Sequence, residues 1–244
     1  VDFQSVMAVP NDMYISGYES KAVNPLVLWS AKSPNSFDMS AFSRGDYAKA
    51  LEGDTMAEVI SKVLYPADDH TEGKKLRLRQ QYLLVSASVQ TILRKHLRDN
   101  KTLDNLPDKV SIHINDTHPA LCVPELMRLL VDEHSYSWDK AWDITCRTLS
   151  YTNHTVMSEA LERWNVSLFE QLLPRVYQIV QEIDRRLRVD LHGYYGNDMG
   201  KIEYMAVISK DEIRMANLCL AACHKVNGVS KLHTEILKDS IFRD

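Results

Sequence analysis

The sequence predicts a helix-rich α/β layer fold in which one part of the sheet is missing. Apolar residues recur at helical spacing over much of the chain, most clearly from 74 to 98. Residues 110–115 instead alternate between apolar and polar side chains, which is typical of a half-buried strand. Further helical patterns alternate with a few short extended segments, and no internal repeat or linker divides them. This alternation favours helices packed on a sheet.

Composition narrows the class of protein. The chain has 244 residues, of which 45% are hydrophobic and 25% charged, so it can bury a sizeable core in one large domain or two small ones. The net charge is 29 − 33 = −4 without long runs of one sign, which argues against a globally basic nucleic-acid binder. The most continuous apolar region, 83–93, is broken by polar residues and does not predict a membrane span.

The four cysteines form no CxxC pair. Cys219 and Cys223 would lie one helical turn apart as small apolar side chains, which favours reduced thiols in a cytoplasmic protein over a zinc or redox site. The chain opens at Val1 inside an extended pattern and closes just after a helical one. We therefore expect a piece of a longer protein.

The first part of the chain predicts two strands and two helices. Strands are expected at 6–9 and 26–29, with turn-forming residues at 10–12 and at 16–17 between them. A helix is expected over 47–63, although Gly53 weakens its first half. A loop leads to a long helix over 74–98. Its expected buried side consists of Leu83, Leu84, Ala87, Ile92 and Leu93.

The central part predicts a strand at 110–115, a helix starting near Pro124 and a helix capped by Ser137. A short extended piece follows at 150–153. Ser167 and Glu170 then match a capping box, which predicts a helix that runs towards Leu191 and is kinked or restarted at Pro174.

The last part predicts two helices. Residues 213–226 are apolar on nearly every side, which indicates a deeply buried helix. Asn227 and Gly228 would end it in a left-handed turn, before a final helix over 230–238.

Polar residues follow two of the predicted strands. They are Asp116, Thr117 and His118 after the first, and His154 and Thr155 after the second. The carboxyl ends of parallel strands are where α/β proteins bind ligands, and these side chains suit the hydroxyl groups of a sugar. Alternatively, Asp116 and Thr117 only cap the turn before a helix. The phosphate-loop, dinucleotide, zinc-protease and serine-hydrolase motifs are all absent from the sequence.

Several segments resemble the α-glucan phosphorylases, the family of the glycogen, starch and maltodextrin enzymes. In order, they are LYP at 64–66, EGK at 72–74, LRL at 76–78, NDTHP at 115–119, PELMR at 124–128, WDKAW at 138–142, YTNHTV at 151–156, EALERW at 159–164 and VNGV at 226–229. The stretch 98–107 resembles the shorter, bacterial-type version of the family.

The resemblance implies that residues 1–244 are an incomplete N-terminal domain, the helix-rich part of the Rossmann-like half of a B-type glycosyltransferase (GT-B) fold. Such enzymes cleave terminal α-1,4 linkages of a glucan with inorganic phosphate and release glucose 1-phosphate with retention. Their pyridoxal phosphate is bound by a lysine of the C-terminal domain, which this chain lacks, so the chain alone is expected to be inactive. The helix at 47–63 resembles the one that reaches the partner subunit of the family's homodimer.

The same resemblance assigns roles to individual residues. His154 would contact the glucosyl unit beside the broken bond, its backbone carbonyl facing the developing positive charge, and Asp116 would orient its imidazole. Asp69 lies in the gate loop, where the family often has asparagine. The other expected substrate-binding residues are Tyr65, Arg77, His118, Thr155, Glu159 and Ala160. Two alternatives remain open: a non-catalytic carbohydrate-binding or dimerisation module, and a helical scaffold whose polar loops are ordinary caps.

Overall fold

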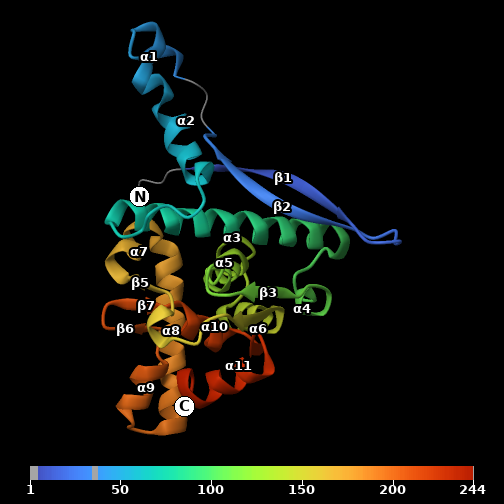
Figure 1. Cartoon of the computed structure of the whole chain (residues 1–244), viewed down its shortest axis with the longest axis vertical. Helices are drawn as coiled ribbons and strands as arrows, with labels where there is room; N and C mark the ends of the chain where they lie inside the picture. Colours follow the sequence, from blue (N-terminus) through green and yellow to red (C-terminus); the bar gives the residue numbers. More distant parts are fainter. Residues whose placement is uncertain (1–4, 35–37, 244) are drawn as a thin grey trace. The chain divides into compact units, whose positions relative to one another are not determined.

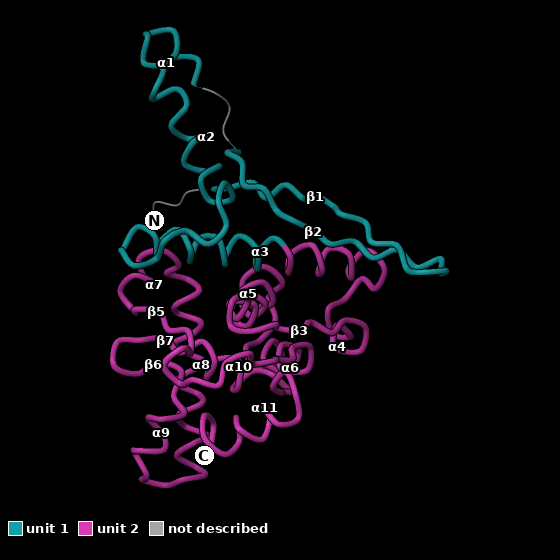
Figure 2. The backbone as a smooth tube through the Cα atoms, in the orientation of Figure 1, with its two compact units in different colours: residues 1–87 teal, residues 88–244 magenta. Residues whose placement is uncertain are grey.

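The computed structural model describes residues 5–34 and 38–243, in the element order shown in Figure 1. The chain divides into two compact units, residues 1–87 and residues 88–244 (Figure 2). The boundary falls inside the long helix α3 (Thr71–Asn100). No helix of the described ranges is long and apolar enough to cross a membrane.

The first unit contains an antiparallel hairpin of β1 (Met7–Ser16) and β2 (Val23–Lys32). The expected turn at 10–12 is wrong, because β1 continues through Pro10, which pairs with Trp29. In a two-stranded sheet both strands have an open edge, where a proline without an N–H is tolerated. The chain reverses at 17–22, where the turn-forming residues at 16–17 predicted a turn, and Gly17 N–H donates to the Ala22 carbonyl at 2.9 Å.

Three helices complete this unit: α1 (Met39–Ser43), α2 (Tyr47–Lys62) and the first part of α3. The expected helix at 47–63 is confirmed, and Asp46 caps it by accepting Lys49 N–H at 3.2 Å. Helix α3 begins three residues before the expected start, with His70 Nδ1 accepting Gly73 N–H at 3.0 Å. Its expected buried side is partly wrong: Leu84 is 45% exposed, whereas Leu78 and Val85 are buried.

Two helical glycines of this unit give a matched test of close packing. An alanine Cβ at Gly73 would lie 1.7 Å from the Ala67 carbonyl oxygen, whereas at Gly53 the nearest atom is Ser33 Oγ at 3.8 Å. Gly73→Ala is therefore expected to lower the free energy of unfolding by about 1–3 kcal/mol through overpacking. Gly53→Ala should raise it by about 0.5–1 kcal/mol through helix propensity. Denaturant titration compares the two, and a stabilising Gly73→Ala would contradict the predicted contact.

The second unit contains a three-stranded parallel sheet. Its strands are β3 (Ile112–Asn115), β4 (Leu149–Asn153) and β8 (Lys225–Gly228), in the order β3-β4-β8. This confirms the mixed α/β class. Helix α4 (Leu106–Lys109) precedes β3, and α5 (Cys122–Arg128), a π-helical turn (Leu129–Glu133) and α6 (Trp138–Thr148) lie between β3 and β4. The Ser137 cap of α6 is confirmed, because its Oγ accepts Lys140 N–H at 3.4 Å.

A small antiparallel sheet joins β5 (Arg163–Asn165), β7 (Glu212–Arg214) and β6 (Ile208–Ser209). A 3₁₀ turn (Ser158–Ala160) leads into it, and α7 (Val166–Leu172), α8 (Pro174–Tyr195) and α9 (Met199–Met205) follow β5. Of the kink or restart predicted at Pro174, the structure has the restart, because α7 ends at Leu172 and α8 begins at Pro174. The capping box is wrong, because Asn165 caps α7 by accepting Leu168 N–H at 3.2 Å.

The predicted helix at 213–226 is wrong in its bounds. The helical part is α10 (Met215–Ala222); Ile213 belongs to β7, and Val226 to β8, which also contains Asn227 and Gly228, the residues expected to form a left-handed stop. A continuous apolar run does not distinguish buried strand from buried helix, which explains the error. The last helix, α11 (Lys231–Ile236), is confirmed with Ser230 as its cap, and a π-helical turn (Leu237–Ile241) extends it.

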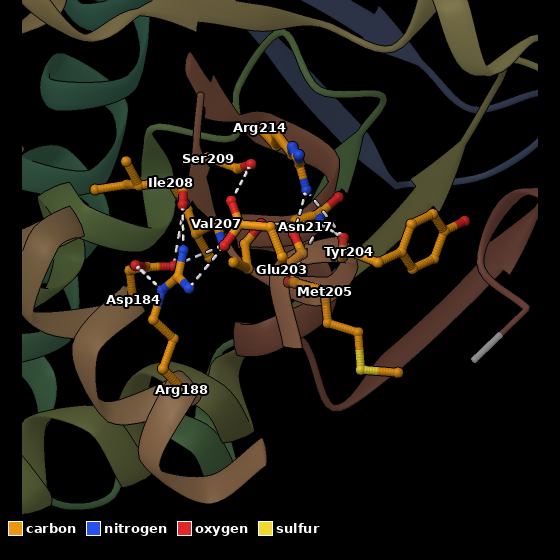
Figure 3. Close-up of polar contacts among 11 residues, drawn as sticks. Asp184, Arg188, Glu203, Tyr204, Met205, Val207, Ile208, Ser209, Arg214 and Asn217 are labelled. Atoms are coloured by element: carbon orange, nitrogen blue, oxygen red, sulfur yellow. Dashed lines mark hydrogen bonds and ion pairs between the residues drawn. The ribbon is translucent and has the colours of Figure 1, made fainter. Parts of the chain in front are cut away.

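A polar network fastens α9 and β6 to α8 (Figure 3). The buried Asp184 accepts the N–H groups of Val207 and Ile208, at 2.8 and 3.0 Å, and Arg188 Nε at 2.8 Å. Arg188 also donates to Glu203 Oε2 at 3.0 Å and to the Ile208 carbonyl at 2.6 Å. Hydrogen bonds from Ser209 and, second, from Arg188 lower the pKa of Glu203. The network satisfies backbone groups that neither sheet nor helix pairs.

Candidate functional site at the carboxyl edge of the parallel sheet

Strands β3 and β4 end side by side, as the sequence predicted. Asn115 pairs with Thr152, and Asp116 N–H extends the ladder by donating to the Thr152 carbonyl at 2.9 Å. His154 follows β4 directly and its side chain is exposed. The two predicted loops therefore leave one edge of one sheet.

The imidazole of His154 is held by Asn115. Its Nε2 lies 2.6 Å from Asn115 Oδ1. An amide oxygen only accepts, so Nε2 carries the proton. Asp116 instead uses Oδ1 to accept Thr117 N–H at 2.7 Å. Among the described residues no hydrogen bond joins Asp116 to His154, so the orienting role of Asp116 stays a prediction.

Asp116 has a left-handed backbone, with φ of +64°. Aspartate adopts this conformation more readily than most residues, because its short side chain can bond locally. The hydrogen bond that the Asp116 carboxylate accepts from Thr117 N–H is such a local contact. Both predicted roles of Asp116 are compatible with this geometry. It caps the turn, and it also lies at the strand end beside Asn115, where a sugar-site residue is expected.

A chain of hydrogen bonds crosses one face of the sheet below this edge. Ser150 Oγ donates to His113 Nδ1 at 2.9 Å, and His113 Nε2 lies 2.6 Å from Thr152 Oγ1. Thr152 Oγ1 donates to Asn227 Oδ1 at 3.1 Å, and Asn227 Nδ2 to the Gly228 carbonyl at 2.8 Å. These bonds tie together β3, β4 and β8. This set of residues was not predicted from the sequence, although the polar alternation of Ser150 and Thr152 opposite His113 is a signal for it.

The loop after β4 is fixed by the fully buried Asn153. Its Nδ2 donates to the Tyr151 hydroxyl at 2.8 Å, and its Oδ1 accepts Thr155 N–H at 2.9 Å. Burial raises the pKa of Tyr151 above its ordinary range. Thr155 Oγ1 in turn accepts Met157 N–H at 3.2 Å. The backbone on either side of His154 is therefore ordered while its ring remains accessible.

The other candidates of the second unit have different surroundings. Glu159 and Ala160 are exposed on the 3₁₀ turn, where Ser158 Oγ donates to Glu159 Oε2 at 3.3 Å. His118 is half-buried in the turn between β3 and α5. Glu159 and Ala160 are thus open to solvent, whereas His118 is partly enclosed.

The first unit carries Tyr65, Asp69 and Arg77. The Arg77 guanidinium lies 6.0 Å from the centre of the Tyr65 ring, and its Nη1 donates to Asp68 Oδ2 at 2.8 Å. Tyr65 has a φ of +56°, which is uncommon for a bulky side chain and costs about 1–3 kcal/mol. Such backbone strain clusters at ligand sites. Asp69 is exposed. Tyr65, Arg77 and Asp68 thus lie together, with the Arg77 guanidinium in contact with both the Tyr65 ring and the Asp68 carboxylate.

The cysteines are structural in character. Burial raises the pKa of Cys122, Cys146 and Cys223 to about 12, and that of Cys219 well above its ordinary value. Burial therefore disfavours the thiolate, which is the form that acts as a nucleophile. Over the described ranges no cluster of histidine, cysteine or acidic residues could hold a metal ion.

These features define an α/β protein with a candidate ligand site at the carboxyl edge of a parallel sheet. The family model of the carbohydrate phosphorylases matches residues 1–244, and the chain belongs to that family. It is 47% identical to the muscle form of human glycogen phosphorylase and to the brain form of rat glycogen phosphorylase, and 46% identical to the sheep muscle form. Each match covers 100% of this chain and 30% of the relative, so the chain spans about a third of their length.

Proposed function

We propose that this chain is the glucan-binding part of the N-terminal, GT-B-type domain of a glycogen phosphorylase. The observation that carries the proposal is the family match over the whole chain together with the shared strand edge that bears Asn115, Asp116 and His154. The parent enzyme would cleave terminal α-1,4 linkages of glycogen or maltodextrin with inorganic phosphate.

In this proposal the residues at the strand edge bind the sugar and stabilise the charge that forms on it. The exposed His154 would bond a sugar hydroxyl, and the carbonyl of the same residue would stabilise the positive charge that develops at the anomeric carbon. The bond to Asn115 restricts the ring, so little reorganisation is needed when a sugar binds. Thr155, Glu159, Ala160 and His118 would line the sugar site, with Asp116 at its strand end. Within the first unit, Tyr65, Asp69 and Arg77 would bind substrate as well.

Pyridoxal phosphate does not fit the lysines described here. A lysine that forms a Schiff base needs an enclosed pocket that lowers its pKa. In residues 5–34 and 38–243 every lysine is exposed except Lys75 and Lys201, which are half-buried. Lys75 pairs with Glu72 at 2.9 Å, and Lys201 lies over the Tyr195 ring at 5.1 Å. The cofactor of the parent would therefore be held by residues outside this chain.

Helix α2 supports a homodimer of the parent. Ala50, Ala57 and Ile60 are buried, whereas four of its large apolar side chains are 43–58% exposed. These exposed residues are Tyr47, Leu51, Met56 and Val59. Exposed apolar residues on one helix are typical of a protein interface. The same feature favours the second candidate function, a dimerisation module without catalysis.

Phosphorolysis separates the two functions. We expect no glucose 1-phosphate from the 244-residue chain with maltoheptaose and phosphate, and sustained release from the intact parent. The measurement is coupled detection of glucose 1-phosphate for both proteins at equal concentration. Release by the isolated chain would contradict its assignment as one side of the cleft. An intact parent that forms dimers but releases no product would favour the non-catalytic module.

A further inference from the structure

The ring of His233, on α11, joins the loop after β4 to the turn after β8. Its Nε2 lies 2.7 Å from the Thr155 carbonyl oxygen, and its Nδ1 accepts Val229 N–H at 3.1 Å. A carbonyl oxygen only accepts, so Nε2 carries the proton and Nδ1 the lone pair. The side chain is 5% exposed, and both of its ring nitrogens are therefore used.

The surroundings leave this ring little freedom. Ser230 Oγ accepts His233 N–H at 3.1 Å and so fixes the start of α11, while Thr234 Oγ1 accepts Gly228 N–H at 3.0 Å. Gly228 also packs directly on the imidazole: a Cβ there would lie 2.8 Å from His233 Nδ1 and 2.9 Å from its Cγ. The end of β8 and the histidine thus fit only because this residue is glycine.

Thr155 is consequently held at both of its backbone polar groups. Its N–H donates to Asn153 Oδ1 from within the same loop, and its carbonyl accepts from His233, 78 residues further along the chain. His154 lies between Asn153 and Thr155. The peptide unit between His154 and Thr155 is fixed by the bond to Asn153, and the next one, after Thr155, by the bond to His233, although the His154 side chain is exposed.

We propose that His233 is a positioning residue for His154. By holding the Thr155 carbonyl, it would keep the backbone carbonyl of His154 aimed at the reacting sugar. The part that concerns catalysis rests on the proposed function; the clamp on the loop does not. Small displacements of a group that stabilises the transition state can cost about 100-fold in rate, which is why such a clamp would matter.

Two substitutions separate the two bonds of the ring. In His233→Asn the amide can still accept Val229 N–H but is too short to reach Thr155. In His233→Gln the longer amide can still donate to the Thr155 carbonyl. We expect exchange of the Thr155 and Met157 amide hydrogens in the 244-residue chain to accelerate about tenfold in His233→Asn, the factor that one hydrogen bond is worth. In His233→Gln it should stay within about twofold of the wild type.

Unchanged exchange in His233→Asn, or equal acceleration in both variants, would overturn the clamp. Gly228→Ala provides a second route if His233→Asn does not fold, because the added methyl displaces the ring without removing it. It should accelerate exchange at the same two amides, and exchange that stays as in the wild type would likewise overturn the clamp.

The intact phosphorylase tests the catalytic part. We expect His233→Asn to lower kcat about tenfold with the KM for maltoheptaose within about twofold, and His233→Gln to restore most of the loss. A wild-type kcat in His233→Asn, or losses carried entirely by KM, would overturn the positioning role. Absence of phosphorolysis in the wild-type parent would instead overturn the proposed function, and the exchange measurement would still decide whether the clamp exists.

Discussion

Replacing Asp184 with alanine is expected to lower the free energy of unfolding by about 3–5 kcal/mol, the cost of breaking a buried pair from one side. Asp184 is 7% exposed, and its carboxylate accepts two backbone N–H groups, those of Val207 and Ile208, besides Arg188 Nε. Its removal leaves these buried N–H donors without their acceptor, and water does not replace it fully. Because the two N–H groups lie where β6 begins, the whole connection from α9 to the small sheet depends on this side chain.

Asp190→Ala is the matched control, since Asp190 lies on the same helix and is exposed. It should change the free energy of unfolding by no more than about 0.5 kcal/mol. Urea titration followed by circular dichroism compares the two variants with the wild type. Similar midpoints for Asp184→Ala and Asp190→Ala would mean that the network in Figure 3 contributes little to stability.

Replacing His154 with alanine in the intact phosphorylase is expected to lower kcat about 100-fold while the KM for maltoheptaose changes less than about threefold. The reason is that contacts to the reacting sugar strengthen as charge develops at the anomeric carbon, so their loss is felt in the transition state more than in the bound ground state. Steady-state kinetics with varied glucan give both constants. Equal losses in turnover and affinity would mean that His154 contributes only to binding.

A second prediction concerns Asn115, whose side chain holds the imidazole of His154. If its Oδ1 orients the imidazole, then Asn115→Ala should lower kcat about tenfold and have little further effect once His154 is already alanine. Asn197→Ala, in an exposed loop, is the control and should leave kcat unchanged. Losses that multiply in the double variant would show that the two residues act independently, and would return the orienting role to Asp116 or to another group.

The position of the candidate site could be predicted from the sequence because it depends on local signals. The alternation at 110–115 and the extended piece at 150–153 place two strand ends, and the polar residues come directly after them. Ser137 as a cap and Pro174 as a restart are equally local, since each acts on the first turn of its own helix. Family resemblance then supplied the roles of individual side chains.

The partners of these side chains could not be predicted in the same way. His154 contacts Asn115, 39 residues away, and Thr155 contacts His233, 78 residues away. Such pairings depend on strand order and register rather than on periodicity. The third parallel strand, β8, was not predicted for a related reason. Val226 continues the apolar pattern of the preceding helix, and only pairing with β4 makes it a strand.

In the proposed function, the carboxyl edge of β3 and β4 binds α-1,4-glucan. The most direct test is titration of maltoheptaose into the isotope-labelled 244-residue chain, followed by the backbone and side-chain NMR signals of every residue that can be assigned. Binding through this edge predicts saturable shifts centred on Asn115, Asp116, His154 and Thr155, and their loss in His154→Ala. Saturable shifts that avoid these four residues, or that persist unchanged in His154→Ala, would contradict it.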